Sequence, residues 1–270
     1  MPPDALLAPW RVRWGLESDG AAFATPSSAL QPVRRTGEAL FLKVATSDEE
    51  RAGNAVLVWW GGRGAVRVRE SDGPAVLLER GGDDLTALAR SGPDGDDEAT
   101  RILCRAGRTL HQAGRGRRPD GLIPLERWFR DLLDGGDLGD PGLTAAAAGV
   151  AARLLAHPAG DVVLHGDLHH GNVLDFGPDG RLAIDPKPLH GDPGFDVANI
   201  LCNPDAAVAT APGRLERAVA VIAAETGMVE RRILEWALAW GALSAVWSRQ
   251  EGADGSPAIE VARRARALLD

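Results

Sequence analysis

Three polar side chains stand at a fixed spacing in the strand-like segment 164–186. Asp167 follows an apolar run, Asn172 comes five positions later, and Asp185 ends a second apolar run thirteen positions further on. Residues 177–180, Gly-Pro-Asp-Gly, predict a tight turn between the last two of these positions. The chain must therefore fold so that a short hairpin brings one amide close to two carboxylates.

A carboxylate, an amide and a second carboxylate in this order are the groups that phosphoryl transfer from a metal-bound nucleotide requires. One acid can receive the proton of the attacking hydroxyl, while the amide oxygen and the other acid hold Mg²⁺ against the phosphates. Each residue alone has a simpler interpretation, because Asp and Asn also cap turns and end strands. The order of all three favours a catalytic site over three separate turn residues.

The composition is that of a globular protein with an acidic surface. Of 270 residues, 44% are hydrophobic and 25% are charged, and the net charge is −8. This charge argues against a nucleic acid partner and favours a cationic substrate, although acidity also serves solubility. No secretory signal or membrane-length apolar run is visible, and Cys104 and Cys202 lack disulfide or zinc spacing. We expect a cytoplasmic protein that binds no membrane and keeps both cysteines as buried thiols.

Lysine is rare in this chain and is therefore informative. Lys43 and Lys187 are the two lysines among 30 basic residues. A composition that uses Arg wherever either residue serves suggests that the remaining lysines are needed as ammonium groups. Lys43 ends an alternating apolar run, which disfavours a solvated surface lysine. Lys187, two residues after Asp185, could contact substrate or phosphate, or pair with a surface acid.

The pattern along the chain predicts an α+β protein with two lobes. Residues 1–80 contain mostly strands around one helix, which begins after Ser47 as N-cap. Residues 81–270 are mainly helical and start with a Gly-Gly-Asp-Asp breaker. The expected strands are 10–16, 29–34, 39–45, 65–70, 75–79, 162–165, 172–176 and 181–184. The expected helices are 48–60, 84–90, 98–113, 125–134, 143–156, 196–202, 213–225, 229–249 and 257–269, with exposed connections at 91–97 and 134–142.

The motif resembles a known family. Residues 165–167 (His-Gly-Asp), Asn172 and residues 184–186 (Ile-Asp-Pro) resemble the catalytic and metal-binding loops of the aminoglycoside phosphotransferase family. The resemblance implies the bilobal protein-kinase-like fold, with a small antiparallel-sheet N-lobe and a larger helical C-lobe. The segments that look like the streptomycin 6-phosphotransferase and hydroxyurea-kinase branch are 59–66, 77–79, 164–174, 184–188 and 191–199.

The resemblance implies a role for each residue of the motif. Asp167 would be the catalytic base, or would orient the substrate hydroxyl. Asn172 and Asp185 would bind Mg²⁺. Lys43 would hold the α- and β-phosphates of the nucleotide, and Glu50 would pair with Lys43.

The remaining nucleotide contacts are expected in the first lobe. Glu49, next to Glu50, is the alternative partner of Lys43. Leu77, Leu78 and Glu79 would line the adenine pocket and supply backbone groups. The first hairpin has no Gly-x-Gly-x-x-Gly loop, and Ser27 and Ser28 are candidates for phosphate contact instead, although such a pair is also typical of an ordinary turn.

Several neighbouring residues have a structural interpretation. We expect His165 to buttress the catalytic loop. Asp196 could brace that loop or merely cap the following helix. The tryptophans at 236, 240 and 247 share a helical face and are expected in the core, although the resemblance implies that this helix borders the substrate side. The acids at 131, 134, 137 and 140 could attract a guanidinium or ammonium group, but we expect a solvated loop.

These observations predict ATP-dependent, or GTP-dependent, transfer of a phosphoryl group with Mg²⁺ to a hydroxyl of a small, cationic molecule. The resemblance implies an aminoglycoside such as streptomycin, as in a streptomycin 6-kinase, with hydroxyurea, sugars and amino-alcohols as alternatives. We expect a monomer or a weak dimer. Two other classes are left open: a nucleotide-binding pseudokinase, and a metallophosphoesterase that would use the clustered residues His165, Asp167, His169 and His170.

Overall fold

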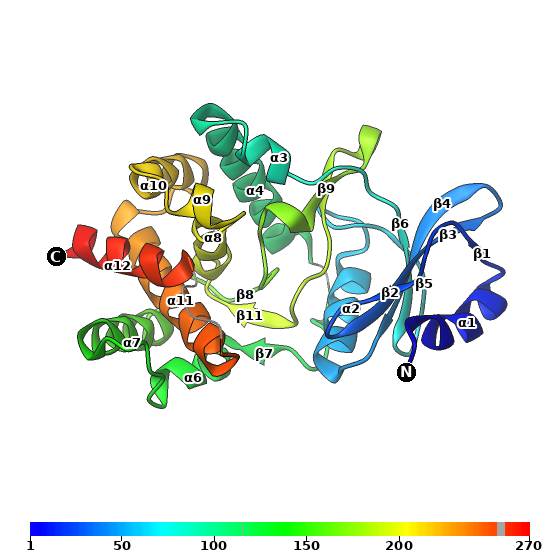
Figure 1. Cartoon of the computed structure of the whole chain (residues 1–270), viewed down its shortest axis with the longest axis horizontal. Coiled ribbons are helices and arrows are strands. Elements are labelled where there is room, and N and C mark those ends of the chain that lie inside the picture. The colour runs from blue at the N-terminus through cyan, green and yellow to red at the C-terminus, as the bar shows by residue number, and fades with distance from the viewer. Residues whose placement is uncertain (115, 253–256) are drawn as a thin grey trace.

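The structure is a computed structural model, and it describes residues 1–114, 116–252 and 257–270. Figure 1 shows a sheet-containing part beside a larger, mainly helical part. The sheet is antiparallel, with strand order β1-β3-β4-β6-β5 and with β2 paired to β3. Its strands are β1 (Glu17–Ser18), β2 (Phe23–Ala24), β3 (Ser28–Arg35), β4 (Glu38–Ala45), β5 (Val68–Asp72) and β6 (Ala75–Glu79). The predicted α+β class is confirmed.

The two faces of this sheet carry different side chains, because side chains alternate along a strand. One face packs against α1 (Pro3–Trp14) and forms a separate core of buried residues. The members of this core are Leu7, Leu16, Ala29, Val33, Leu40, Leu42, Val44, Ala75 and Leu77. The other face of β4 and β6 points towards the helical part.

Helix α1 replaces a predicted strand. The strand expected at residues 10–16 is wrong, since the chain is helical to Trp14 and stops at Gly15, which has a left-handed φ of 60°. Apolar and polar residues are mixed around this helix, and only Leu7 is fully buried. Without a clear apolar face, the sequence lacks the 3.6-residue period that marks a helix.

Helix α2 (Asp48–Trp60) agrees with its predicted bounds. The Ser47 hydroxyl accepts a hydrogen bond from the Glu50 backbone N–H at 3.2 Å, and three acidic residues occupy the first turn. Both features stabilise the positive end of a helix dipole. This cap matters for the site because it fixes the turn that carries Glu49 and Glu50.

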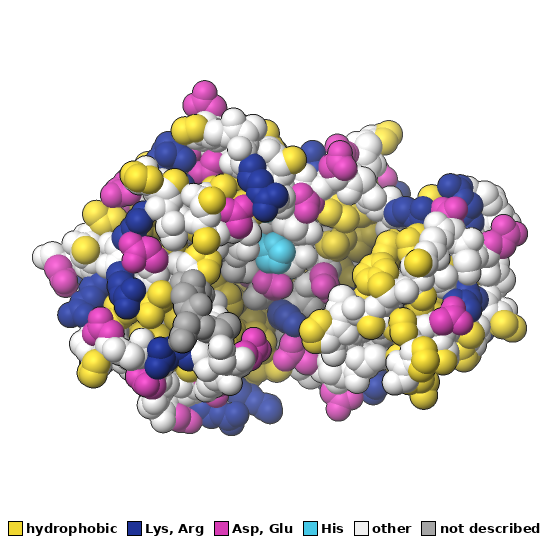
Figure 2. All heavy atoms as spheres, in the orientation of Figure 1, with side chains coloured by type: hydrophobic (Ala, Val, Ile, Leu, Met, Phe, Trp, Pro, Cys, Tyr) yellow, Lys and Arg dark blue, Asp and Glu magenta, His cyan; other side chains and the backbone are white. Residues whose placement is uncertain are grey.

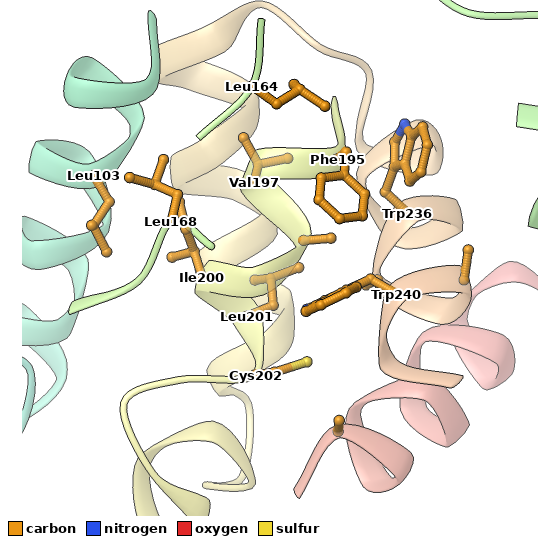
Figure 3. Close-up of a cluster of buried hydrophobic side chains, with 14 of the residues drawn as sticks. Leu103, Leu164, Leu168, Phe195, Val197, Ile200, Leu201, Cys202, Trp236 and Trp240 are labelled. Atoms are coloured by element: carbon orange, nitrogen blue, oxygen red, sulfur yellow. The ribbon is translucent and has the colours of Figure 1, made fainter. Parts of the chain in front are cut away.

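The helical part surrounds α8 (Gly194–Leu201), whose eight residues are all buried. Figure 3 shows Phe195, Val197, Ile200 and Leu201 of this helix packed beside Trp240 and the other labelled core side chains. The other helices are α3 (Thr86–Ala89), α4 (Pro93–Ala113), α5 (Leu125–Trp128), α6 (Arg130–Leu133), α7 (Pro141–Ala156), α9 (Ala206–Ala209), α10 (Arg214–Thr226), α11 (Glu230–Gln250) and α12 (Pro257–Leu269). The predicted core position of Trp236 and Trp240 is confirmed.

Short strands carry the polar motif. β9 (Val173–Asp175) and β10 (Arg181–Ala183) form the predicted hairpin, joined through a turn. A second small sheet, β7-β11-β8, was not predicted apart from β8. Its strands are β7 (Ile123–Pro124), β8 (Val162–Val163) and β11 (Leu189–Gly191).

Other differences from the predicted elements are small. Residues 93–97, expected as an exposed connection, form the first turns of α4, because Pro93 can occupy the first turn of a helix. Helix α9 was not predicted. β6 ends at Glu79, where the lobe boundary was expected; the division into lobes 1–80 and 81–270 stays a prediction.

Cys104 and Cys202 are both free and buried, in agreement with the sequence, and burial raises the pKa of each thiol to about 12. Among the described residues, no helix is both long and apolar enough to span a bilayer.

Candidate active site

The register of the β9–β10 hairpin brings the metal-ligand candidates together. Ala183 pairs with Val173, and the Ile184 N–H donates to the Asn172 carbonyl oxygen at 2.9 Å. Asp185 therefore directly follows the residue that is hydrogen-bonded to Asn172. Its φ of 60° is uncommon for a residue with a Cβ and turns its carboxylate out of the strand direction.

The Lys43 ammonium lies between two carboxylates, those of Glu50 and Asp185. Lys43 is buried, with 4% of its surface exposed. The choice between Glu49 and Glu50 is thereby resolved, since the Glu49 carboxylate instead pairs with Lys187 at 2.9 Å. Burial acts to raise the pKa of Asp185, but the charge and hydrogen bond of Lys43, together with Glu50 and the charge of Lys187, hold that pKa below the ordinary value.

Helix α2 reaches this cluster because of one glycine. Gly53 faces the turn after Asp185, and a Cβ at this position would overlap the Pro186 carbonyl oxygen. The close approach sets Glu50, one turn earlier on the helix, beside Lys43. We infer that a side chain at residue 53 would push the helix away from the motif.

Asp196 braces the catalytic loop from α8. Its carboxylate accepts the backbone N–H groups of His165 at 2.9 Å and Gly166 at 2.8 Å, and it lies 2.8 Å from His111 Nε2. Burial tends to raise the pKa of Asp196, but its hydrogen bonds and the nearby histidines favour the charged form, so the pKa is lowered. The alternative of a simple helix cap is wrong, because α8 begins at Gly194.

His165 connects the Asp167 segment of the motif to the Ile184 segment, in agreement with the expectation that it supports the catalytic loop. Its Nδ1 accepts the Asp167 backbone N–H at 3.2 Å, and its Nε2 lies 2.9 Å from the Ile184 carbonyl oxygen. This arrangement requires a neutral ring that carries its proton on Nε2. Burial of the ring lowers the pKa of His165, which keeps it in that state.

The Asp167 carboxylate is held at the opening of the loop. Its Oδ1 accepts a hydrogen bond from Asn199 Nδ2 at 2.9 Å, and its Oδ2 lies 3.4 Å from Asn172 Nδ2 and 3.7 Å from His169 Nε2. Burial would raise the pKa of Asp167, but His169, His165 and Asn199 together hold it below the ordinary value. Asp167 is therefore a carboxylate at neutral pH.

A slot of about 360 Å³ opens beside Lys43 between the sheet and the β9–β10 hairpin. Its walls are mostly apolar, and Figure 2 shows hydrophobic side chains in the hollow between the two parts of the molecule. The residues around it are Phe23, Leu30, Phe41, Lys43, Leu78, Glu79, Arg80, Gly81, Leu174, Phe176, Ile184 and Asp185. A mostly apolar slot with a lysine in its lining suits a purine nucleotide, whose base is apolar and whose phosphates are anionic.

Leu77 does not line this slot, which corrects the prediction for its side chain. Leu77 is opposite Leu42 in the sheet, and both side chains belong to the core under α1. Phe41 and Leu78 are the pair on the other face. The strand period of two decides this, because neighbouring residues must face opposite sides.

The slot also contains residues that the sequence did not single out. Phe41 lies two positions before Lys43 on β4 and so shares its face, which alternation could have indicated. Leu174 and Phe176 alternate in the same way on the hairpin. No signal in the sequence pairs Phe23 with Phe41, whose ring centroids are 6.1 Å apart.

The serine pair lies next to the motif without lining the slot. The Ser27 hydroxyl donates to Glu50 Oε2 at 3.0 Å, which links the first hairpin to the partner of Lys43. The Ser28 N–H donates to Thr25 Oγ1 at 3.1 Å, and the Ser28 side chain is buried. Phosphate contact by Ser27 or Ser28 stays a prediction.

A second cavity, of about 540 Å³, lies beside Lys187 and its partner Glu49. It is lined by Glu49, Ile123, Arg127, Trp128, Arg130, Asp131, Lys187, Trp247 and Glu251. The Trp247 indole N–H donates to Asp131 Oδ2 at 2.8 Å, and the rings of Trp128 and Trp247 meet edge to face at 5.4 Å. Asp131, expected in a solvated loop, is thus fixed at a cavity wall.

The motif fits a magnesium ion that also binds phosphates. Asn172 Nδ2 donates to the Asp167 carbonyl oxygen at 2.9 Å, which leaves Asn172 Oδ1 available next to Asp185. Amide and carboxylate oxygens are the donors Mg²⁺ prefers, and it often takes one or two of them together with phosphate oxygens.

A dinuclear phosphoesterase centre does not fit. Across residues 1–114, 116–252 and 257–270, no group of three or more His, Cys, Asp and Glu side chains could hold a metal. Both ring nitrogens of His165 already have backbone partners, and His169 Nδ1 accepts the Gly171 N–H at 3.0 Å.

Comparisons with known proteins agree with this geometry. Residues 13–252 match the family model described as aminoglycoside/hydroxyurea antibiotic resistance kinase. The chain is 45% identical to a streptomycin 3''-kinase of Klebsiella pneumoniae, over 96% of this chain and 99% of the relative. It is 35% identical to a hydroxyurea phosphotransferase of Kitasatospora aureofaciens over 95% of this chain and 76% of the relative. It is 38% identical to a streptomycin 6-kinase of Streptomyces glaucescens over 72% of this chain and 64% of the relative.

Solved structures show the same fold at low sequence identity. A thermostable aminoglycoside phosphotransferase APH(4)-Ia, in complex with ADP and hygromycin B, superposes with a TM-score of 0.69 at 15% identity and 98% coverage of both chains. A choline/ethanolamine kinase family protein from Mesorhizobium loti gives 0.66 at 19% identity, covering 99% of this chain and 93% of that one. The predicted protein-kinase-like fold is confirmed. The family match and the identity to these kinases together show that the chain belongs to the aminoglycoside/hydroxyurea antibiotic resistance kinase family.

Proposed function

We propose that this protein is an ATP-dependent kinase that phosphorylates a hydroxyl of streptomycin. The observation that carries the proposal is that Lys43 and Asp185 pair with each other in the lining of the apolar slot, while the hairpin and the loop before it bring Asn172 and Asp167 together next to Asp185. The slot would take the adenine. The cavity beside Lys187, which we call the acceptor cavity, would take the aminoglycoside.

The resemblance in sequence alone implies phosphorylation at the 6-position, but the comparisons favour another hydroxyl. The relative that acts at the 3''-position is 45% identical over almost the whole chain, while the 6-kinase is 38% identical over 72% of it. We therefore propose the 3''-hydroxyl as the acceptor. Hydroxyurea is the second candidate because the family and one relative carry its name.

Asn172 and Asp185 would hold Mg²⁺, which when bound neutralises charge on the nucleotide phosphates. Lys43 would release one of its two carboxylate partners to reach the phosphates, while Glu50 keeps it in place. Asp167, as a carboxylate, would accept the hydrogen bond of the acceptor hydroxyl and orient its oxygen towards the γ-phosphorus. A carboxylate with a lowered pKa is a weak base, which suits a loose transition state that needs little proton abstraction before phosphoryl transfer.

The test is transfer from ATP to streptomycin by the purified full-length protein with Mg²⁺. We expect a phosphomonoester that ³¹P–¹H correlation NMR places at the 3''-position. The same assay with GTP, and with hydroxyurea and choline as acceptors, tests the donor and the alternatives. A protein that binds ATP but transfers phosphate to none of these acceptors would contradict the proposal and favour a pseudokinase.

Asp131 is expected to contribute to binding of the cationic acceptor. Asp131→Asn keeps an oxygen for the Trp247 N–H but removes the negative charge from the wall of the acceptor cavity. We expect the KM for streptomycin to rise by about threefold to tenfold, since a guanidinium of the acceptor loses a charge-assisted hydrogen bond. The KM for ATP should stay unchanged.

Asp134→Asn is the matched control, because Asp134 lies three residues later, at the end of α6, and does not line the acceptor cavity. Its KM for streptomycin should be that of the wild type. Equal KM values for wild type and Asp131→Asn would remove Asp131 from the acceptor site.

A further inference from the structure

Helix α8 contacts the catalytic loop at two points, one turn apart. Asp196 accepts the backbone N–H groups of the loop, and Asn199, three residues later, donates to the Asp167 side chain. Residues three apart lie on the same face of a helix. One buried helix thus holds both the backbone and the carboxylate of the loop.

The Asn199 amide is itself fixed by two donors. Its Oδ1 accepts the Trp240 indole N–H at 3.1 Å and Asn203 Nδ2 at 2.9 Å. With the oxygen committed to these donors, the NH₂ group must face Asp167, where it donates at 2.9 Å. Asn199 is buried at 5% exposure, so solvent offers little competition for these bonds.

We infer that Asn199, oriented by Trp240, is a positioning residue that locks Oδ1 of Asp167 and so presents Oδ2 to the acceptor hydroxyl. Asp167 Oδ2 has weaker neighbours than Oδ1, with Asn172 Nδ2 at 3.4 Å and His169 Nε2 at 3.7 Å. A free carboxylate can rotate about its last torsion, and this torsion has broad energy minima. The hydrogen bond from Asn199 removes that freedom. The inference rests on the proposed function, because it assigns a role in phosphoryl transfer.

Two variants remove the donor in different ways. Asn199→Leu has a similar size and no polar group. Asn199→Asp keeps an acceptor for Trp240 but places a carboxylate where the NH₂ group was. For each we expect kcat to fall by about tenfold to a hundredfold, since a small misplacement of a catalytic group has an effect of this order. The KM for ATP should stay the same, because Lys43 and the apolar slot are untouched.

Two tryptophans of α11, Trp240 and Trp236, provide a test variant and its matched control. Trp240→Phe removes the N–H that orients Asn199, and kcat is expected to fall by about twofold to tenfold. Trp236→Phe makes the same chemical change one turn earlier on the helix, where the buried indole N–H has no hydrogen-bond partner among the residues that the structure describes. Figure 3 shows that both rings extend from α11 into the same core. A purely structural role for these side chains would give both variants the same kcat.

The outcomes are separable from those of the proposed function. If the wild type transfers no phosphate to streptomycin, then streptomycin is not the acceptor. The kcat values of the wild type and the variants can then be compared by ATP hydrolysis in the absence of an acceptor. A shift of the Trp240 indole ¹H–¹⁵N resonance in Asn199→Leu reports the hydrogen bond without any activity. Wild-type kcat in a folded Asn199→Leu would overturn the inference. If that variant does not fold, equal kcat values for Trp240→Phe and Trp236→Phe would overturn it.

Discussion

Replacing Asp167 with Asn is expected to lower kcat by about a hundredfold to ten-thousandfold. The amide keeps the size of the side chain but loses the charge that, in the proposed function, orients the acceptor hydroxyl and takes its proton. The dissociation constant of ATP should change little, because Lys43, Asn172 and Asp185 remain. Steady-state kinetics and calorimetric titration with a non-hydrolysable nucleotide measure the two quantities.

The pH dependence of the wild type follows from the same carboxylate. The pKa of Asp167 lies below its ordinary value of 3.8, so the charged form persists down to more acidic pH. Activity that depends on this charge is retained above pH 3.8 and is lost only as the pH falls through the lowered pKa.

Asp179→Asn, in the exposed turn of the hairpin, is the control for Asp167→Asn and should keep full activity. A kcat near that of the wild type for Asp167→Asn would assign the role of base elsewhere.

Replacing Arg214 with Met is expected to lower the free energy of unfolding by about 3–5 kcal/mol. Arg214 is fully buried, and its guanidinium donates twice to the Asp96 carboxylate, both times at 3.1 Å. It also donates to the carbonyl oxygens of Leu201, at 2.6 Å, and Ile200 at the end of α8, and to that of Asn203 just beyond the helix. Without the guanidinium, the buried Asp96 carboxylate loses two of its hydrogen bonds and these carbonyl oxygens lose a partner.

Urea unfolding followed by circular dichroism measures this loss. Arg101→Met, which breaks a solvent-exposed pair with Glu98 on α4, is the control and should leave the midpoint nearly unchanged. Adding Asp96→Leu to Arg214→Met should recover part of the loss, because it removes the buried carboxylate, whose Oδ1 has lost the Arg214 guanidinium while its Oδ2 keeps Arg217 Nη2 at 3.0 Å. An unchanged midpoint for Arg214→Met would show that this ion pair does not hold α8 in place.

Prediction from the sequence worked best where the signal is local. Ser47, the acidic first turn and the apolar spacing sufficed for α2, and the turn at 177–180 sufficed for the hairpin. Prediction from the sequence was less successful for segments whose secondary structure depends on packing against the rest of the protein. The strand expected at 10–16 is the helix α1, which is held by contact of Leu7 with the sheet.

The candidate site shows the same difference between features that local sequence signals indicate and features that tertiary packing decides. The sequence made Asp167, Asn172 and Asp185 candidates by their types and spacing, and made Lys43 a candidate through the resemblance and the scarcity of lysine, but it placed Leu77 on the wrong face of β6. It could not choose between Glu49 and Glu50, which are adjacent on one helix turn. Only the packing of α2 against the motif shows that Glu50 faces Lys43 and Glu49 faces Lys187.

The sequence by itself determined which polar groups the hairpin brings together, because Asp167, Asn172 and Asp185 stand within some twenty residues at spacings that local structure alone sets. The tertiary structure decided which distant side chains support them. Asn199 is 32 positions from Asp167, and Lys43 is 142 positions from Asp185. Such contacts depend on how buried helices and sheets pack against each other, and that packing depends on the shape of the whole core.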